Sequence, residues 1–97
     1  MDLINKRAVV CGSTQGIGKS TAIKLAEMGA SIVLISRNIE KLNRVLSELP
    51  LVDQNQNHEV LIADFSNPKS LKETLDNYLQ QEKTVHILVN NTGGPPG

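Results

Sequence analysis

The stretch Gly12-Ser13-Thr14-Gln15-Gly16-Ile17-Gly18 decides which fold the sequence favours. Its glycines have the spacing G-x-x-x-G-x-G, and it separates a short apolar run from a segment with helical periodicity. We expect Gly12 to make a tight turn, Gly16 to let the backbone approach a ligand, and Gly18 to let a helix pack near a strand. A helix that begins here offers unpaired N–H groups and the positive end of its dipole. The loop is therefore suited to a pyrophosphate group.

Outward from this loop, apolar runs alternate with helical segments. We expect strands at residues 8–11, 31–36, 58–63 and 85–89, and their continuous apolar character indicates burial on both faces, as in a parallel sheet. The expected helical stripes are Gly18, Ala22, Leu25 and Ala26; Leu42, Val45, Leu46 and Leu49; and Leu71, Leu75, Tyr78 and Leu79. This order predicts an α/β fold, a partial Rossmann-type doubly wound parallel sheet with strand order 3-2-1-4.

Turn and capping residues mark the ends of these helices. Gly29 and Pro50 are expected to end the first two helices, and Asn67-Pro68 to begin the third. The polar residues 50–57 then form a connection within one domain rather than a linker between two.

The end of the second expected strand bears on the choice of cofactor. A carboxylate there would bond to the adenosine ribose of NAD, but no Asp or Glu occurs between Glu27 and Glu40. The strand instead ends in Ser36, Arg37 and Asn38. Arg37 suits the 2′-phosphate of NADP, and the other two could add hydrogen bonds. The sequence therefore favours NADP over NAD.

A P-loop is the competing interpretation of the glycine loop. Gly18-Lys19-Ser20 resembles the end of that motif, and the apolar residues 60–63 followed by Asp64 resemble the strand that helps to hold magnesium. The motif needs a glycine five positions before Gly18, where Ser13 stands. Lys19 is then expected on the exposed side of the first helix, and a nucleotide triphosphatase stays the less favoured alternative.

Composition excludes several other classes of protein. The 97 residues are 39% hydrophobic and 21% charged, with a formal net charge of zero, which argues against nucleic-acid and membrane partners. A single cysteine and two aromatic residues exclude an internal disulfide and a base-stacking surface. No apolar run is long enough for a membrane span or a signal peptide, so we expect a cytoplasmic protein.

Three motifs in order resemble the amino-terminal part of the short-chain dehydrogenase/reductase family. Residues 11–18 resemble its T-G-x-x-x-G-I-G, Asp64-Phe65 resembles its D-[hydrophobic] pair, and Asn90-Asn91-Thr92-Gly93 resembles its N-N-A-G. The chain looks most like the bacterial branch that contains 3-oxoacyl-carrier-protein reductases. Cys11 replaces the usual Thr and Thr92 the usual Ala. Gln15 stands where many NADP-using members have a second basic residue.

The resemblance implies an oxidoreductase that binds a nicotinamide dinucleotide and transfers hydride to or from a carbonyl or alcohol substrate. It gives Asp64 a contact with adenine and leaves Asn90 and Asn91 to brace the sheet or meet the cofactor ribose. Gly93 then lets the chain leave the pocket. The predicted cofactor-binding residues are Gly12, Ser13, Thr14, Gln15, Gly16, Ile17, Gly18, Ser36, Arg37, Asn38, Asp64, Phe65, Asn90, Asn91, Thr92 and Gly93.

No catalytic residue is predicted within these 97 positions. The family uses a Ser, a Tyr and a Lys four positions after that Tyr, all beyond the fourth strand. Tyr78, the one tyrosine, lies on an apolar stripe, and Lys83 follows it by five positions, so we expect Tyr78 to pack. His86 and Cys11 are likewise expected to be structural.

We therefore expect residues 1–97 to be the amino-terminal part of a single dinucleotide-binding domain, inactive alone, from a longer and homo-oligomeric oxidoreductase. The alternative is a catalytically inactive nucleotide-binding module. An isolated chain would leave its fourth strand as an unpaired apolar edge, so we expect it to self-associate or stay partly unfolded.

Overall fold

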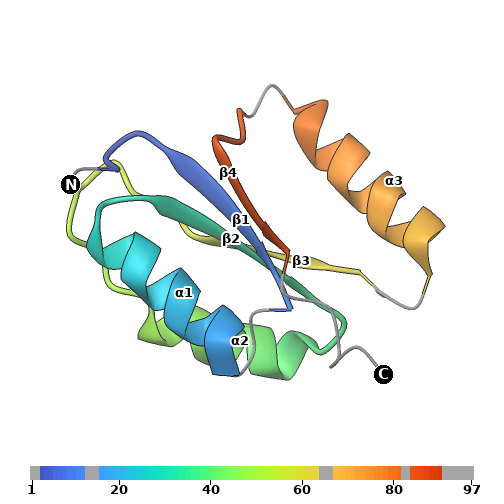
Figure 1. Ribbon diagram of the computed structural model, residues 1–97, viewed down its shortest axis with the longest axis horizontal. Coiled ribbons are helices and arrows are strands. Elements are labelled where there is room, and N and C mark those ends of the chain that lie inside the picture. Colours follow the sequence, from blue (N-terminus) through green and yellow to red (C-terminus); the bar gives the residue numbers. More distant parts are fainter. Residues whose placement is uncertain (1–2, 13–15, 64–66, 82–83, 91–97) are drawn as a thin grey trace.

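The computed structural model describes residues 3–12, 16–63, 67–81 and 84–90. Within them the expected alternation of strands and helices is confirmed (Figure 1). The elements are β1 (Arg7–Cys11), α1 (Gly16–Glu27), β2 (Ser31–Ser36), α2 (Ile39–Glu48), β3 (Glu59–Ile62), α3 (Pro68–Leu79) and β4 (Ile87–Asn90). The third strand is shorter than predicted, and the fourth begins later.

The strands form one parallel sheet in the order β3-β2-β1-β4, as predicted. Cys11 at the end of β1 is opposite Ile35 in β2 and Asn90 in β4. Ser36 is opposite Ile62 at the end of β3. The register therefore brings the carboxyl ends of the strands to one edge of the sheet, which we call the carboxyl edge; the opposite edge is the amino edge.

The helices cover the two faces of the sheet unequally. Helices α1 and α2 lie together on one face and α3 lies on the other (Figure 1). In β2, Ile32 and Leu34 pack beneath α1 and α2, whereas Val33 and Ile35 join the cluster that contains Tyr78 of α3. Strands β1 and β2 are thus buried on both faces, which explains their continuous apolar sequences.

The two outer strands do not follow the prediction of burial on both faces. Ile62 in β3 is 52% exposed and Leu88 in β4 is 61% exposed, because each of these strands has only one neighbour in the described sheet. Other residues of the two strands, among them Val60, Leu61 and Val89, still pack against the core. The stripe of α3 is also narrower than predicted. Tyr78 is buried, but Leu79 is 47% exposed, and α3 is the one described helix on its face of the sheet.

The predicted helix ends are confirmed. Gly29 follows α1 with φ 101°, a left-handed conformation that favours glycine, and its N–H donates to Ala26 O at 3.0 Å. Asn67 caps α3, with its side chain accepting from Ser70 N at 3.2 Å, and Pro68 takes the first helical position. Among the described residues, no helix has the length and apolar character needed to cross a bilayer.

Candidate functional site

The carboxyl edge gathers the ends of strands that are far apart in sequence. Hydrogen bonds between strands continue one residue past the ends of β1 and β3: Gly12 N donates to Ile35 O at 2.9 Å, and Ala63 N donates to Ser36 O at 3.1 Å. The chain therefore leaves the sheet from well-fixed points. In open α/β sheets this edge is where ligands bind.

Gly12 turns the chain out of β1 in the way that the sequence predicted. Its φ of 71° lies in the left-handed region, where a side chain is strained. Helix α1 begins at Gly16, its Gly18 is buried, and its first turn contains no acidic residue. Ser13, Thr14 and Gln15 lie outside the described residues, as does the side chain of Ile17. The amino end of α1 thus follows a glycine turn at the carboxyl edge.

The three residues at the end of β2 have different surroundings. Ser36 is half-buried and still paired in the sheet, whereas Arg37 is exposed. Asn38 caps α2: its Oδ1 accepts a hydrogen bond from Lys41 N at 3.0 Å. Asn38 was predicted as a cofactor contact and not as this cap, although an Asn directly before a helical segment is a recognised capping signal.

The second and third motifs lie mostly outside the described residues. This applies to Asp64, Phe65, Asn91, Thr92 and Gly93. Asn90 is the last residue of β4, and its backbone lies opposite Cys11, next to the turn at Gly12. The described flanks of these motifs thus end at the carboxyl edge, while the roles of the motif residues stay predictions.

Tyr78 packs, as predicted, and lies away from that edge. It is 2% exposed, and its hydroxyl donates to Glu59 Oε2 at 2.7 Å, at the first residue of β3. Burial raises the pKa of Tyr78 well above its usual range; the hydrogen bond and negative charge of Glu59 add to the rise, and the charge of Arg7 opposes it. A phenol held in its neutral form in this way anchors α3 to the sheet.

Cys11 and His86, two further residues with reactive side chains, have structural surroundings as well. Cys11 is buried, and burial raises the pKa of its thiol, which disfavours the reactive thiolate. His86 lies just before β4, is exposed, and accepts a hydrogen bond at Nδ1 from Arg7 N at 3.0 Å. The described residues contain no group of His, Cys, Asp or Glu that could hold a metal ion.

Lys19, the lysine on which the P-loop interpretation depends, forms an ion pair with α2. Its Nζ lies 2.8 Å from Glu48 Oε2 at the end of α2, and its side chain is about a third exposed, at 34%. This ion pair joins the start of α1 to the end of α2 and directs the ammonium group toward that helix.

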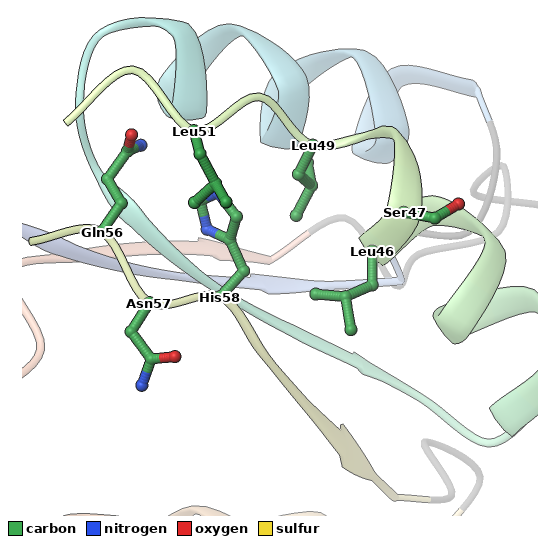
Figure 2. Close-up of a pocket in the computed structure, with 7 residues that line it drawn as sticks. All are labelled: Leu46, Ser47, Leu49, Leu51, Gln56, Asn57 and His58. Atoms are coloured by element: carbon green, nitrogen blue, oxygen red, sulfur yellow. The ribbon is translucent and has the colours of Figure 1, made fainter. Parts of the chain in front are cut away.

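A pocket of about 370 Å³ lies at the amino edge rather than the carboxyl edge (Figure 2). Its lining residues come from the end of α2 and the connection to β3: Leu46, Ser47, Leu49, Leu51, Gln56, Asn57 and His58. The side chains of Gln56 and His58 are bonded to backbone groups of the protein itself. The polar part of this pocket thus supports the fold.

Comparison with known proteins agrees with the fold. The family model for short chain dehydrogenases matches residues 6–97. Human retinol dehydrogenase 11 is 39% identical over 93 residues, which are 96% of this chain and 29% of that protein. The narrower resemblance to 3-oxoacyl-carrier-protein reductases stays a prediction.

Two solved structures show the same architecture. One is a short-chain type dehydrogenase/reductase from Mycobacterium ulcerans, with a TM-score of 0.84, 26% identity and coverage of 99% of this chain and 35% of that chain. The other is a metagenomic short-chain oxidoreductase in complex with NADP, with a TM-score of 0.82, 34% identity and coverage of 95% and 41%. The chain spans less than half of the length of each of these three proteins. On sequence and fold together, it belongs to the short-chain dehydrogenase/reductase family.

Proposed function

We propose that this chain forms the dinucleotide-binding part of an NADP-dependent oxidoreductase, which transfers hydride between the nicotinamide ring and a carbonyl or alcohol substrate. The observation that carries the proposal is the left-handed turn at Gly12. It lies where the strand ends align, and α1 begins four residues later.

The described residues fit the phosphates of such a cofactor. A glycine turn allows the backbone to come close to a ligand, and the start of α1 supplies N–H groups and the positive end of the helix dipole. The first turn of α1 has no acidic side chain that would repel an anion. When bound, the nicotinamide supplies or accepts the hydride; this chain's own residues bind and orient the dinucleotide.

The end of β2 supports NADP rather than NAD. Arg37 is exposed directly after the strand, and its guanidinium suits the 2′-phosphate. No Asp or Glu occurs between Glu27 and Glu40, so the end of β2 has no carboxylate that could bond to a ribose 2′-hydroxyl. The similar metagenomic oxidoreductase was solved in complex with NADP, which agrees with this preference. The name of the human relative, a retinol dehydrogenase, agrees with an alcohol substrate.

The test measures the affinities of the full-length protein for NADPH and for NADH by titration, in the wild type and in Arg37→Asp. We expect the wild type to bind NADPH more tightly, and the variant to lose about tenfold or more of that preference, because a charge-assisted contact to phosphate becomes a repulsion.

Arg44→Asp is the matched control. Arg44 is exposed within α2, and the variant changes the net charge by the same amount. It should keep the preference for NADPH. Equal binding of NADPH and NADH by the wild type would overturn the proposed specificity, and no binding of either would overturn the proposed site.

A further inference from the structure

We propose that Asn38 determines cofactor specificity as a positioning residue: its side chain caps α2 and thereby fixes Arg37, rather than bonding to the 2′-phosphate itself. This inference rests on the proposed function and adds to it a residue whose role comes from the observed hydrogen bonds.

The backbone around Arg37 is fixed on both sides. On one side, Ser36 is still part of the sheet, opposite Ile62, and its carbonyl accepts from Ala63 N at 3.1 Å. On the other side, Asn38 is extended, with φ −108° and ψ 102°. A single residue, Arg37, therefore connects the last sheet position to the cap, and the conformation of Asn38 sets where its backbone lies.

Asn38 is fixed by two hydrogen bonds to α2. Its Oδ1 accepts from Lys41 N at 3.0 Å, and its backbone carbonyl accepts from Leu42 N at 3.0 Å. Leu42 belongs to α2 and is fully buried in the core between the helices and the sheet, so the first turn of α2 is anchored. The side-chain bond therefore ties the segment that carries Arg37 to a helix turn that is anchored in the core.

Capping also limits what Asn38 could do for a ligand. Its side-chain oxygen is engaged with the helix, and an amide oxygen would in any case be a poor partner for an anion, because both are acceptors. The amide nitrogen is the one side-chain group left that could donate to a phosphate. The two roles can be separated, because a serine can cap a helix but has no amide nitrogen.

Asn67 provides an internal control. It caps α3 with the same chemistry, accepting from Ser70 N at 3.2 Å, and has a similar conformation, with φ −121° and ψ 93°. Its position after β3 places it away from Arg37 in the chain. Loss of either cap should affect stability similarly, whereas loss of the Asn38 cap alone should affect recognition of the 2′-phosphate.

The experiment measures the ratio of NADPH to NADH affinity in the full-length protein, together with the melting temperature, for Asn38→Ala, Asn38→Ser and Asn67→Ala. We expect Asn38→Ala to lower the ratio by about fivefold, because a cap of ordinary strength no longer holds Arg37. Asn38→Ser should restore most of the ratio. Asn67→Ala should lower the melting temperature but leave the ratio of NADPH to NADH affinity unchanged.

Other outcomes overturn the inference. If Asn38→Ser loses the preference as fully as Asn38→Ala, the amide nitrogen contacts the cofactor directly. If Asn38→Ala keeps the ratio, the cap is structural only. Should Asn38→Ala fail to fold, Asn38→Gly removes the same side chain at a smaller cost to the helix and should show the same lower ratio. A wild type without any preference refutes the proposed NADP specificity instead, so the two failures are distinguishable.

Discussion

At the amino edge of the sheet, buried polar side chains bond to the protein's own backbone, whereas at the carboxyl edge the described chain leaves the sheet through a glycine turn and a helix cap. Gln56 illustrates the first region: its Nε2 donates to Ala26 O at 2.9 Å and Ala30 O at 2.7 Å, and its Oε1 accepts from two backbone N–H groups. Gly12 illustrates the second, because its left-handed turn brings backbone to the edge without a side chain.

His58 is a second polar side chain at the amino edge that bonds to the protein's own backbone. Its Nδ1 accepts from Ile32 N at 3.0 Å, and its Nε2 lies 2.9 Å from Pro50 O. A neutral ring with its hydrogen on Nε2 satisfies both contacts. A pocket with a histidine, two amides and several leucines would ordinarily be the first site to consider. The side chains of Gln56 and His58, however, are already hydrogen-bonded to backbone groups of the protein. Polar residues near a cavity thus indicate a ligand site only when their bonds remain available.

The largest expected effect is at the amino edge. Gln56→Ala removes a buried side chain that bonds to four backbone groups, so we expect the free energy of unfolding to fall by about 3 kcal/mol. Urea unfolding measures it. Gln54→Ala, at an exposed position two residues earlier, should change it by less than about 0.5 kcal/mol. Similar effects of the two variants would contradict the structural role of Gln56.

A pair of glycine variants separates the two edges. Gly12→Ala and Gly29→Ala both place a side chain at positive φ, and each should cost about 1–2 kcal/mol of stability. At Gly29 a Cβ would also lie 2.7 Å from Ile4 Cγ1 and 3.1 Å from Ile4 N. We expect Gly12→Ala alone to weaken NADPH binding, by about tenfold or more. Equal NADPH affinities of the two folded variants, measured by titration, would remove the functional difference between the edges.

The smallest expected effect concerns Tyr78 at the amino edge. Because its pKa is raised in the folded protein, ionisation favours the unfolded chain, so its contribution to stability is complete below the unfolded pKa of about 10 and is lost as pH rises beyond it. Tyr78→Phe should cost about 1 kcal/mol at neutral pH and remove this part of the alkaline loss.

Absorbance provides the check on Tyr78. The tyrosinate difference spectrum between the wild type and Tyr78→Phe should titrate above the usual range in folded protein and near pH 10 in urea. A midpoint near 10 in the folded protein would contradict the buried bond to Glu59. Glu59→Gln, which keeps an acceptor but removes the charge, should move the folded midpoint part of the way back.

The sequence by itself determined the features that depend on neighbouring residues. The alternation of strands and helices, the turn at Gly12, the stop at Gly29 and the cap at Asn67 were all predictable, because backbone conformation is set by nearby residue types and by apolar period. The strand order followed from the rules for parallel crossovers and the family resemblance.

Tertiary structure alone decided which side chains remain available. Gln56 bonds to carbonyls 26 and 30 positions away, and Tyr78 bonds to Glu59, 19 positions away, so neither role could be predicted from the local pattern. Leu88 has the same apolar character as the buried Leu34, yet it is 61% exposed because β4 is an outer strand of the described sheet. Burial and hydrogen-bond partners depend on segments brought together by folding, and a periodic pattern contains no information about those distances.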